Sequence, residues 1–462
     1  MDAPRPGDPD PLGRGPRLTR HPSNPKRAAK QVTDRAATDL LSGDHLAVIV
    51  DSPPGAGKST FVVDTAVGLT KQQHQVPIVA QTNAQADDLI RSLIRRPGSL
   101  EVGRLTGSSG RGSLDPADRL TVSSRVADLD DCDVIVGTAA KWAYVANDIS
   151  PYEAGIIDEA YQMRSDQLLY VGQIFERALM VGDPGQLDPF SPIDDTRWRG
   201  YSDGPINPAI ATVLHNHPDS PVHRLPVSWR LPALCAPLVS EAFYPTMPFE
   251  AGTTTRDRHI AVAGARGGRV DKSIMQAADT GWSFLELPER TAPPTDREAV
   301  ATVAQIVVRL LSLSVTVHDA SRTPTSAPLQ AHNLAVGVVH RNQRAAIRVE
   351  VDLQARMTGI DASAVVVDTA NRLQGREFDM VVVLHPLSGR AAASEFHLET
   401  GRLCVLLSRH RQACIVVGRA GIADVLDAHP GDTPIWIGAP IPVPDGWEAN
   451  QIVIERLICH RI

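Results

Sequence analysis

The stretch Asp51-Ser-Pro-Pro-Gly-Ala-Gly-Lys-Ser-Thr60 decides the fold of this chain. The apolar run at 46–50 precedes it and predicts a buried parallel strand, and the run at 61–69 follows it with the apolar spacing of a helix. Such a strand, turn and helix bind phosphate, because backbone N–H groups and the helix N-terminus then point at one anion. Although Ser52 stands where these loops usually begin with glycine, the stretch predicts that the chain binds a nucleoside triphosphate together with Mg²⁺.

Each residue type in this loop suits one part of a nucleotide. Gly55 and Gly57 let backbone N–H groups turn inward, Lys58 reaches the outer phosphates, and the Ser59 hydroxyl can ligate Mg²⁺. The alternative is a chance Gly/Pro turn, which the agreement of strand, Gly-Lys-Ser and helix disfavours. The predicted nucleotide-binding residues of the loop are Pro54, Gly55, Ala56, Gly57, Lys58, Ser59 and Thr60.

Composition bounds the class of protein. A hydrophobic content of 42% with 21% charged residues is typical of a globular protein, and 462 residues suggest two domains. No run of 18 or more apolar residues occurs and the N-terminus has no hydrophobic signal region, so we expect a cytoplasmic protein without a membrane span. The five cysteines are scattered, which disfavours a zinc site or disulfide framework. A net charge of −7 does not exclude nucleic acid, because a groove can be locally basic.

The chain divides into four expected parts. Residues 1–28, rich in Pro, Gly and Arg, predict a disordered tail, and 29–235 carry the phosphate loop in a first domain. Residues 236–295 include a Gly/Arg/Pro/Thr-rich stretch without periodicity, and we expect a linker or insertion there. In 296–462, helical patterns alternate with buried strands, which predicts a second α/β domain with a parallel sheet and no phosphate loop of its own.

The pair Asp158-Glu159 follows the apolar run at 154–157 and is the second strong signal. In a phosphate-loop enzyme, a carboxylate at a strand's carboxyl end can hold Mg²⁺ through water, and its neighbour can polarise the attacking water. We therefore predict that Asp158 orders the metal and Glu159 activates water. An isolated Asp-Glu pair is more often a solvated loop, but its position after a strand favours the functional interpretation.

Further polar residues follow buried strands. Gln186, in a tight Pro/Gly turn after the run at 178–182, can sense the γ-phosphate by hydrogen bonding, and Arg230 is a candidate positive charge for the transition state. Arg230 could equally be a surface arginine. Thr82 and Asn83 stand at a strand end, where they could hold a ligand backbone or cap the next helix.

Taken together, these motifs resemble the superfamily 1 helicases over residues 30–420, particularly the branch that contains the nonsense-mediated-decay helicase, with its DEAxQ box and QGxE motif. The branch usually has Thr-Arg-Ala where this chain has Ser408-Arg-His410, and it has a tyrosine where this chain has Trp229. The matching segments are Ser52-Pro-Pro-Gly-Ala-Gly-Lys-Ser59, Gln81-Thr-Asn83, Asp158-Glu-Ala-Tyr-Gln162, Gly182-Asp-Pro-Gly-Gln-Leu187, Ser228-Trp-Arg-Leu231, Val367-Asp-Thr-Ala-Asn-Arg-Leu-Gln-Gly-Arg-Glu377 and Gly401-Arg-Leu-Cys-Val-Leu-Leu-Ser-Arg-His410.

The resemblance implies an α/β fold of tandem RecA-like domains of the P-loop NTPase type, with ATP between them. It implies catalytic roles for Glu159, Gln186, Arg230 and Arg409, the last reaching the γ-phosphate from the second domain. It adds Gln31, Gln162, Gln374 and Glu377 as nucleotide-binding residues. It also implies that Thr82, Asn83, Thr138 and Thr369 contact the backbone of a single nucleic-acid strand.

The predicted activity is ATP hydrolysis coupled to movement on single-stranded DNA or RNA, in the 5′-to-3′ direction by analogy with the branch. A nucleic-acid-stimulated ATPase switch that clamps or remodels a complex without unwinding is the alternative, favoured by the short accessory segments. A nucleotide kinase is a third interpretation, against which the motifs of the second domain argue.

Overall fold

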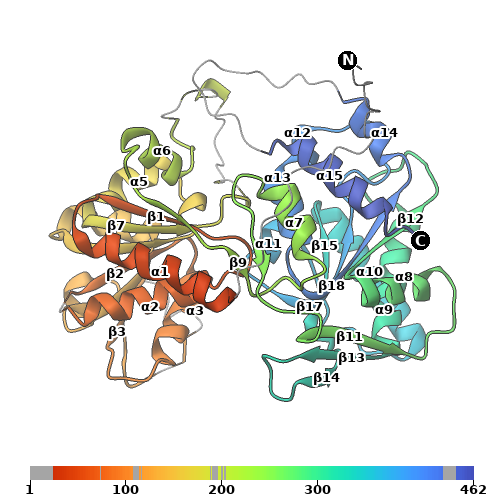
Figure 1. Cartoon of the computed structure of the whole chain (residues 1–462), viewed down its shortest axis with the longest axis horizontal. Helices are drawn as coiled ribbons and strands as arrows, with labels where there is room; N and C mark the ends of the chain where they lie inside the picture. Colours follow the sequence, from red (N-terminus) through yellow and green to blue (C-terminus); the bar gives the residue numbers. More distant parts are fainter. Residues whose placement is uncertain are drawn as a thin grey trace, which may run out of the picture.

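In the computed structural model, two parallel β-sheets form the centres of two α/β units that lie side by side (Figure 1). The structure describes residues 24–72, 74–107, 114–115, 117–187, 189, 196–198, 201, 204–429 and 444–462. Most of the expected tail, residues 1–23, therefore lies outside the described residues. Within the described ranges, no helix combines the length and hydropathy needed to cross a bilayer.

The first unit is built on an eight-stranded sheet in the order β4-β3-β5-β2-β6-β7-β1-β8, and all its strand pairs are parallel. Its strands are β1 (Ala47–Asp51), β2 (Val76–Ala80), β3 (Val102–Leu105), β4 (Leu120–Ser123), β5 (Val134–Thr138), β6 (Tyr152–Asp158), β7 (Phe175–Gly182) and β8 (Val222–Arg224). Its helices are α1 (Pro25–Ser42), α2 (Lys58–Thr70), α3 (Asn83–Ile94), α4 (Ala139–Val145), α5 (Ser165–Val171) and α6 (Ala209–Asn216).

Alternation along the strands produces three layers in this unit. Val48 and Val50 of β1 belong to the apolar cluster shared with α1, α2 and α3, whereas Ala47 and Ile49 belong to the cluster shared with α4, α5 and α6. A parallel sheet covered on both faces needs strands that are apolar on both sides, which explains the near-continuous apolar runs in the sequence. Because all these strands are parallel, the loops that follow their carboxyl ends lie at the same edge of the sheet.

The second unit is built on a five-stranded parallel sheet in the order β12-β18-β17-β15-β16. Helices α8, α9 and α10 pack on one face, and α7, α11, α13, α14 and α15 on the other. The strands are β12 (Trp282–Leu287), β15 (Leu334–Val338), β16 (Val366–Thr369), β17 (Phe378–Leu384) and β18 (His410–Arg419). The helices are α7 (Ala236–Phe243), α8 (Arg269–Thr280), α9 (Arg297–Ser312), α10 (Arg341–Thr358), α11 (Ala370–Leu373), α12 (Glu395–Leu398), α13 (Thr400–Leu407), α14 (Ile422–Asp427) and α15 (Gly446–Ile458).

Two small sheets complete the described fold. Strands β9 (Val227–Ser228) and β10 (Glu250–Ala251) form a short parallel pair between the units. Strands β11 (Arg258–Ala263), β13 (Ser314–Asp319) and β14 (Ser326–Pro328) form an antiparallel sheet that packs against the second unit through β11 and β13 (Figure 1).

The predicted fold class is confirmed, but two expected boundaries differ. Helix α1 begins at Pro25 rather than after residue 28, with the Asn24 side chain as its N-cap; it ends at Ser42, with Gly43 as its C-cap. The expected linker at 236–295 instead holds α7, β10, β11, α8 and β12, and β12 is a strand of the second sheet. Its composition looked irregular because α8 buries mainly small or polar residues, namely Asp271, Ser273, Ile274 and Ala277.

Candidate active site between the two domains

The predicted phosphate loop joins β1 to α2 as a tight turn with two glycines in the left-handed region. Gly55 has φ 72° and Gly57 has φ 89°. A side chain at Gly55 would also overlap the Cβ of Arg230, so the position excludes any larger residue. Ser52 does not have a positive φ; it is buried, and its N–H donates to the carbonyl of Gly182 at 2.8 Å. Glycine is therefore not required at that first position.

Lys58, Asp158 and Glu159 come together at the carboxyl edge of the first sheet. The Lys58 ammonium forms an ion pair with Glu159 and lies 3.8 Å from an Asp158 oxygen. Burial alone would lower the pKa of Lys58, but the charges of Glu159 and Asp158 raise it. Burial and the neighbouring Glu159 charge raise the pKa of Asp158 to about 6, against the opposing effect of Lys58.

Glu159 has a strained backbone, with φ 54° and ψ 42°. It is the one non-glycine residue with positive φ among the described residues. A left-handed glutamate costs free energy that the surrounding structure must supply, and such residues cluster at functional sites. The strain turns the chain sharply after β6 into the 3₁₀ turn Ala160–Gln162, where the buried Nε2 of Gln162 has no hydrogen-bond partner among the described residues.

The loop after β7 reaches into the second unit. Asp183 accepts hydrogen bonds from Gln186 and from the Tyr244 hydroxyl, the latter at 2.6 Å. Burial raises the pKa of Asp183 to about 6. Gln186 Oε1 accepts a hydrogen bond from Gln374 of the second domain at 3.1 Å, and a side chain at Gly401 would overlap the Gln186 carbonyl. This loop thus links the two domains directly through predicted site residues.

Arg230 and Glu377 form a second link. Arg230 Nε lies 3.1 Å from Glu377 Oε2, and Arg411 Nη1 lies 2.9 Å from Glu377 Oε1. Burial would raise the pKa of Glu377, but the two arginines hold it below its usual value. Glu377 is therefore an ionised partner of Arg230 in this structure.

Arg409 is buried, with 1% of its surface exposed. Its Nη2 donates to the Ser408 hydroxyl at 2.9 Å, whereas its Nε has no hydrogen-bond partner in the described part of the chain. Burial and the charge of Arg230 lower the pKa of Arg409 to about 10, and Asp183 acts in the opposite direction. Arg409 therefore lies inside the protein rather than on an outer surface.

A groove of about 570 Å³ lies beside the phosphate loop, between α1 and α2, and is a feature that sequence reasoning missed. Its lining includes Gly57, Thr60 and the indole of Trp229. The signal in the sequence is Trp229, an aromatic residue next to Arg230. Gln31 is exposed on α1, while its neighbours Lys30 and Thr33 line the groove.

The predicted strand-contacting residues lie at strand ends. The Thr82 hydroxyl caps α3, and the Thr138 hydroxyl caps α4 by accepting from Lys141 N–H at 3.3 Å. Both hydroxyls keep a proton that can be donated to a phosphate oxygen. Asn83 accepts from Arg104 at 2.8 Å, and Thr369, at the end of β16, makes no side-chain cap. The capping alternative thus holds for Thr82 without removing its donor.

The residues present suit ATP and Mg²⁺. Lys58 and the N-terminus of α2 form a cationic end, which fits phosphate, and Ser59 with Asp158 offers the oxygen donors that Mg²⁺ prefers. Among the described residues, no group of three or more His, Cys, Asp or Glu side chains could hold a metal. Mg²⁺ in nucleotide sites needs only one or two protein ligands in addition to phosphate, so the pair Ser59 and Asp158 is sufficient.

Fold and site together define a phosphate-loop protein with two tandem RecA-like domains. Two family models, each described as an AAA domain, match residues 29–193 and 210–421. These matches support the architecture that the superfamily 1 resemblance predicts, without distinguishing its branches. No curated protein matches the sequence.

Solved structures similar to this chain include the PRRSV helicase, with 15% identity, a TM-score of 0.42, and coverage of 83% of this chain and 54% of that chain. They also include arterivirus nonstructural protein 10, a helicase, alone (13% identity, TM-score 0.43, coverage 84% and 61%) and in complex with DNA (13%, 0.44, 86% and 65%). This chain therefore spans less than two thirds of each of these proteins. At such identities and scores, the similarity does not bear on what this chain does.

Proposed function

We propose that this chain is a superfamily 1-type helicase or translocase that couples ATP hydrolysis to movement along a single nucleic-acid strand. The observation that supports it most strongly is the meeting of motif residues from two domains, through Gln186–Gln374 and Arg230–Glu377. A nucleotide kinase has no need of a second RecA-like domain whose motif residues contact those of the first, as Gln374 and Glu377 do here. A motor does, because closure and opening of the two domains convert hydrolysis into displacement.

Each residue of the proposed site has a part in hydrolysis. Lys58 and the α2 N-terminus hold the phosphates, and Ser59 and Asp158 hold Mg²⁺, which neutralises charge on the transferring phosphate. Glu159 accepts a proton from the attacking water, and Gln186 senses the γ-phosphate. Arg230 and Arg409 neutralise charge that develops in the transition state.

The base of the nucleotide fits the groove beside the loop. Its volume of about 570 Å³ lies within the range of small-molecule sites, and the Trp229 ring offers an aromatic face next to Gly57. Gln31 is then the member of the proposed set that must move its exposed side chain to reach a base.

The strand-binding face is proposed at the carboxyl ends of β2, β5 and β16, where Thr82, Asn83, Thr138 and Thr369 lie. Such residues contact the sugar-phosphate backbone, so binding would be largely independent of base sequence. Movement from 5′ to 3′ is proposed from the branch resemblance alone.

The test compares ATP turnover of the full chain with Mg²⁺, alone and with single-stranded DNA or RNA, and displacement of a strand from 5′- and 3′-tailed duplexes. We expect stimulation by a single strand and displacement from the 5′-tailed duplex. Stimulated turnover without displacement would support the alternative, an ATPase switch. Absence of turnover with every nucleic acid would contradict both, and Lys58→Ala serves as the inactive control.

A further inference from the structure

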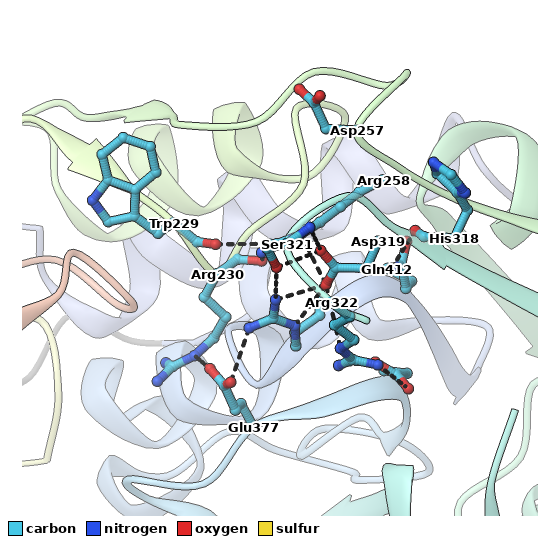
Figure 2. A network of polar contacts seen from close by, with 12 residues as sticks. Trp229, Arg230, Asp257, Arg258, His318, Asp319, Ser321, Arg322, Glu377 and Gln412 are labelled. Atoms are coloured by element: carbon cyan, nitrogen blue, oxygen red, sulfur yellow. Dashed lines mark hydrogen bonds and ion pairs between the residues drawn. The ribbon is translucent and has the colours of Figure 1, made fainter. Parts of the chain in front are cut away.

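The antiparallel sheet of β11, β13 and β14 reaches the candidate active site through a network of ion pairs (Figure 2). Of the residues in this network, only Arg230 and Glu377 were predicted from the sequence as site residues. The network contains Arg230, Arg258, Asp319, Ser321, Arg322, Glu377, Asp379 and Arg411.

Arg258, the first residue of β11, holds the turn that carries Arg230. One of its nitrogens, Nη1, donates to the carbonyl oxygens of Trp229 at 2.6 Å and of Arg230 at 2.7 Å. On its other side, Trp229 N–H donates to the Gly55 carbonyl of the phosphate loop at 2.8 Å. The peptide groups around Trp229 are therefore held between the phosphate loop and the antiparallel sheet, as Figure 2 shows for the Arg258 side.

Asp319, the last residue of β13, holds Arg258 in turn. Its side chain is buried and lies 3.3 Å from Arg258 Nε and 2.6 Å from Arg411 Nη2. Burial alone would raise the pKa of Asp319, but hydrogen bonds from Ser321 and Arg411 and the charge of Arg258 hold it well below its usual range. Asp319 is thus an ionised carboxylate that pairs with two arginines: Arg258, which holds the backbone of Arg230, and Arg411, which pairs with Glu377.

The network also explains how Arg230 can leave Glu377. Glu377 carries a second partner, Arg411, which is itself fixed by Asp319. If Arg230 turns toward a phosphate, Glu377 keeps a cation and is not left unpaired, which limits the free-energy cost of the movement. The backbone of Arg230 meanwhile stays fixed by Arg258, so that only the side chain has to move.

We propose that Arg258, held by Asp319, is a positioning residue that fixes the backbone of Arg230 so that its guanidinium reaches the transferring phosphate. This inference rests on the proposed function, in which Arg230 neutralises transition-state charge. A small misplacement of such a group lowers the rate of the chemical step without weakening ground-state binding of the nucleotide.

The test uses Arg258→Met, which removes the guanidinium, and with it both hydrogen bonds from Nη1, but keeps an unbranched apolar side chain. We expect this variant to fold, because Asp319 retains Arg411, Arg322 and Ser321, and because the Arg258–Arg411 repulsion disappears. The kcat for ATP should fall about 10- to 100-fold, while KM changes by less than about twofold. Arg258→Lys, which keeps the charge but not the planar fork, should give a smaller loss of kcat.

Two comparisons separate positioning from general damage. Arg322→Met also removes an arginine that pairs with Asp319. Because the other partner of Arg322 is Asp379 and not the turn at 229–230, this variant should retain kcat. In a background of Arg230→Met, the Arg258→Met substitution should lower kcat no further, because the group that it positions is gone. Unfolding midpoints of all variants establish that each is folded in the assay.

The outcomes are distinct. Retention of kcat in Arg258→Met, an equal loss in Arg322→Met, or full additivity with Arg230→Met would overturn the positioning role while leaving the proposed function intact. Should Arg258→Met fail to fold, the same cycle with Arg258→Lys decides in the same way. A wild-type chain that does not hydrolyse ATP would overturn the proposed function, and the inference with it.

Discussion

The two walls of the candidate site use opposite edges of their sheets. On the first wall, the phosphate loop, Asp158-Glu159 and Gln186 follow the adjacent strands β1, β6 and β7 and so lie at a carboxyl edge. On the second wall, Glu377 immediately precedes β17 and Arg409 immediately precedes β18, so both lie at an amino edge. The rule that parallel sheets bind ligands at their carboxyl ends therefore finds only half of this site.

The difference also separates the two proposed ligands. In the first domain, the candidate strand-binding residues follow β2 and β5, on the same edge as the phosphate loop and farther along it. In the second domain, Thr369 ends β16 at the carboxyl edge, opposite to the edge with Arg409. A rotation of the second domain would therefore move its nucleotide-facing and strand-facing edges in opposite senses, which suits a motor.

The largest effect is expected at the first wall, which is already assembled around Lys58. Lys58→Ala should lower ATP turnover by about 10³-fold or more, because it removes the cation that binds the phosphates and leaves Glu159 without its ion-pair partner. Steady-state hydrolysis measures the loss. Lys71→Ala, an exposed lysine at the other end of the same helix, should keep wild-type turnover. Equal activity of the two variants would remove the first wall from the mechanism.

The second wall should show a loss of similar order but of a different kind. Arg409→Met should lower kcat by about 10³-fold with nucleotide binding retained, because an arginine from across the cleft acts on transition-state charge. Since the wild-type side chain is buried with an unpaired Nε, the variant should not be less stable than Arg456→Ala, an exposed control on α15. Turnover, nucleotide binding and unfolding midpoints are measured together; wild-type kcat would refute the tandem site.

The junction between the walls should show a pH signature. The pKa of Asp183 is raised to about 6 by burial, so the folded chain binds more protons than the unfolded chain between about pH 4 and 6. Stability contributed at this residue must then fall as pH rises through that window, by about 3 kcal/mol. In Asp183→Asn this loss is absent, so the wild type should lose unfolding free energy relative to the variant from pH 4 to 6.

Asp271→Asn provides the control of opposite sign. Arg309 lowers the pKa of Asp271 to about 2, so this carboxylate contributes stability above pH 4 that is lost on acidification. Denaturant unfolding at a series of pH values distinguishes the two slopes. If the difference in unfolding free energy between wild type and Asp183→Asn does not change with pH, ionisation of Asp183 does not destabilise the folded chain, and the prediction is wrong.

The sequence could predict that the residues of the first wall lie together, because each of them belongs to a local pattern. Gly55, Gly57 and Lys58 follow a strand and open a helix, and Asp158-Glu159 follows another, so strand ends alone bring them together. The strain at Glu159 was not predictable, since no residue type signals a left-handed glutamate.

The rest of the site depends on contacts between distant segments. Only the family resemblance predicts a role for Arg409, because an arginine before a strand carries no signal of its own. Arg258 and Asp319 lie far apart in sequence, and β11 falls in a stretch whose composition resembled a linker. Their ion pair arises from the antiparallel register that sets Arg258 opposite Asp319.

The smallest expected effect lies at the contact that joins the two walls directly. Gln374 donates to Gln186, and Gln186 donates to Asp183, so the proposed γ-phosphate sensor of the first domain is linked to the second domain by a neutral amide–amide hydrogen bond. Such bonds contribute modestly to stability but can couple two sites by a factor of about 5 or more. Gln374→Leu should therefore lower the ratio of strand-stimulated to basal turnover by about fivefold.

Gln354→Leu on α10, whose amide donates to the Ala301 carbonyl within the second domain, should leave that ratio unchanged. If Gln374→Leu lowers basal and stimulated turnover by the same factor, Gln374 acts as a nucleotide contact, as the sequence motif predicts, and the link between the walls must run through Arg230 and Glu377 instead.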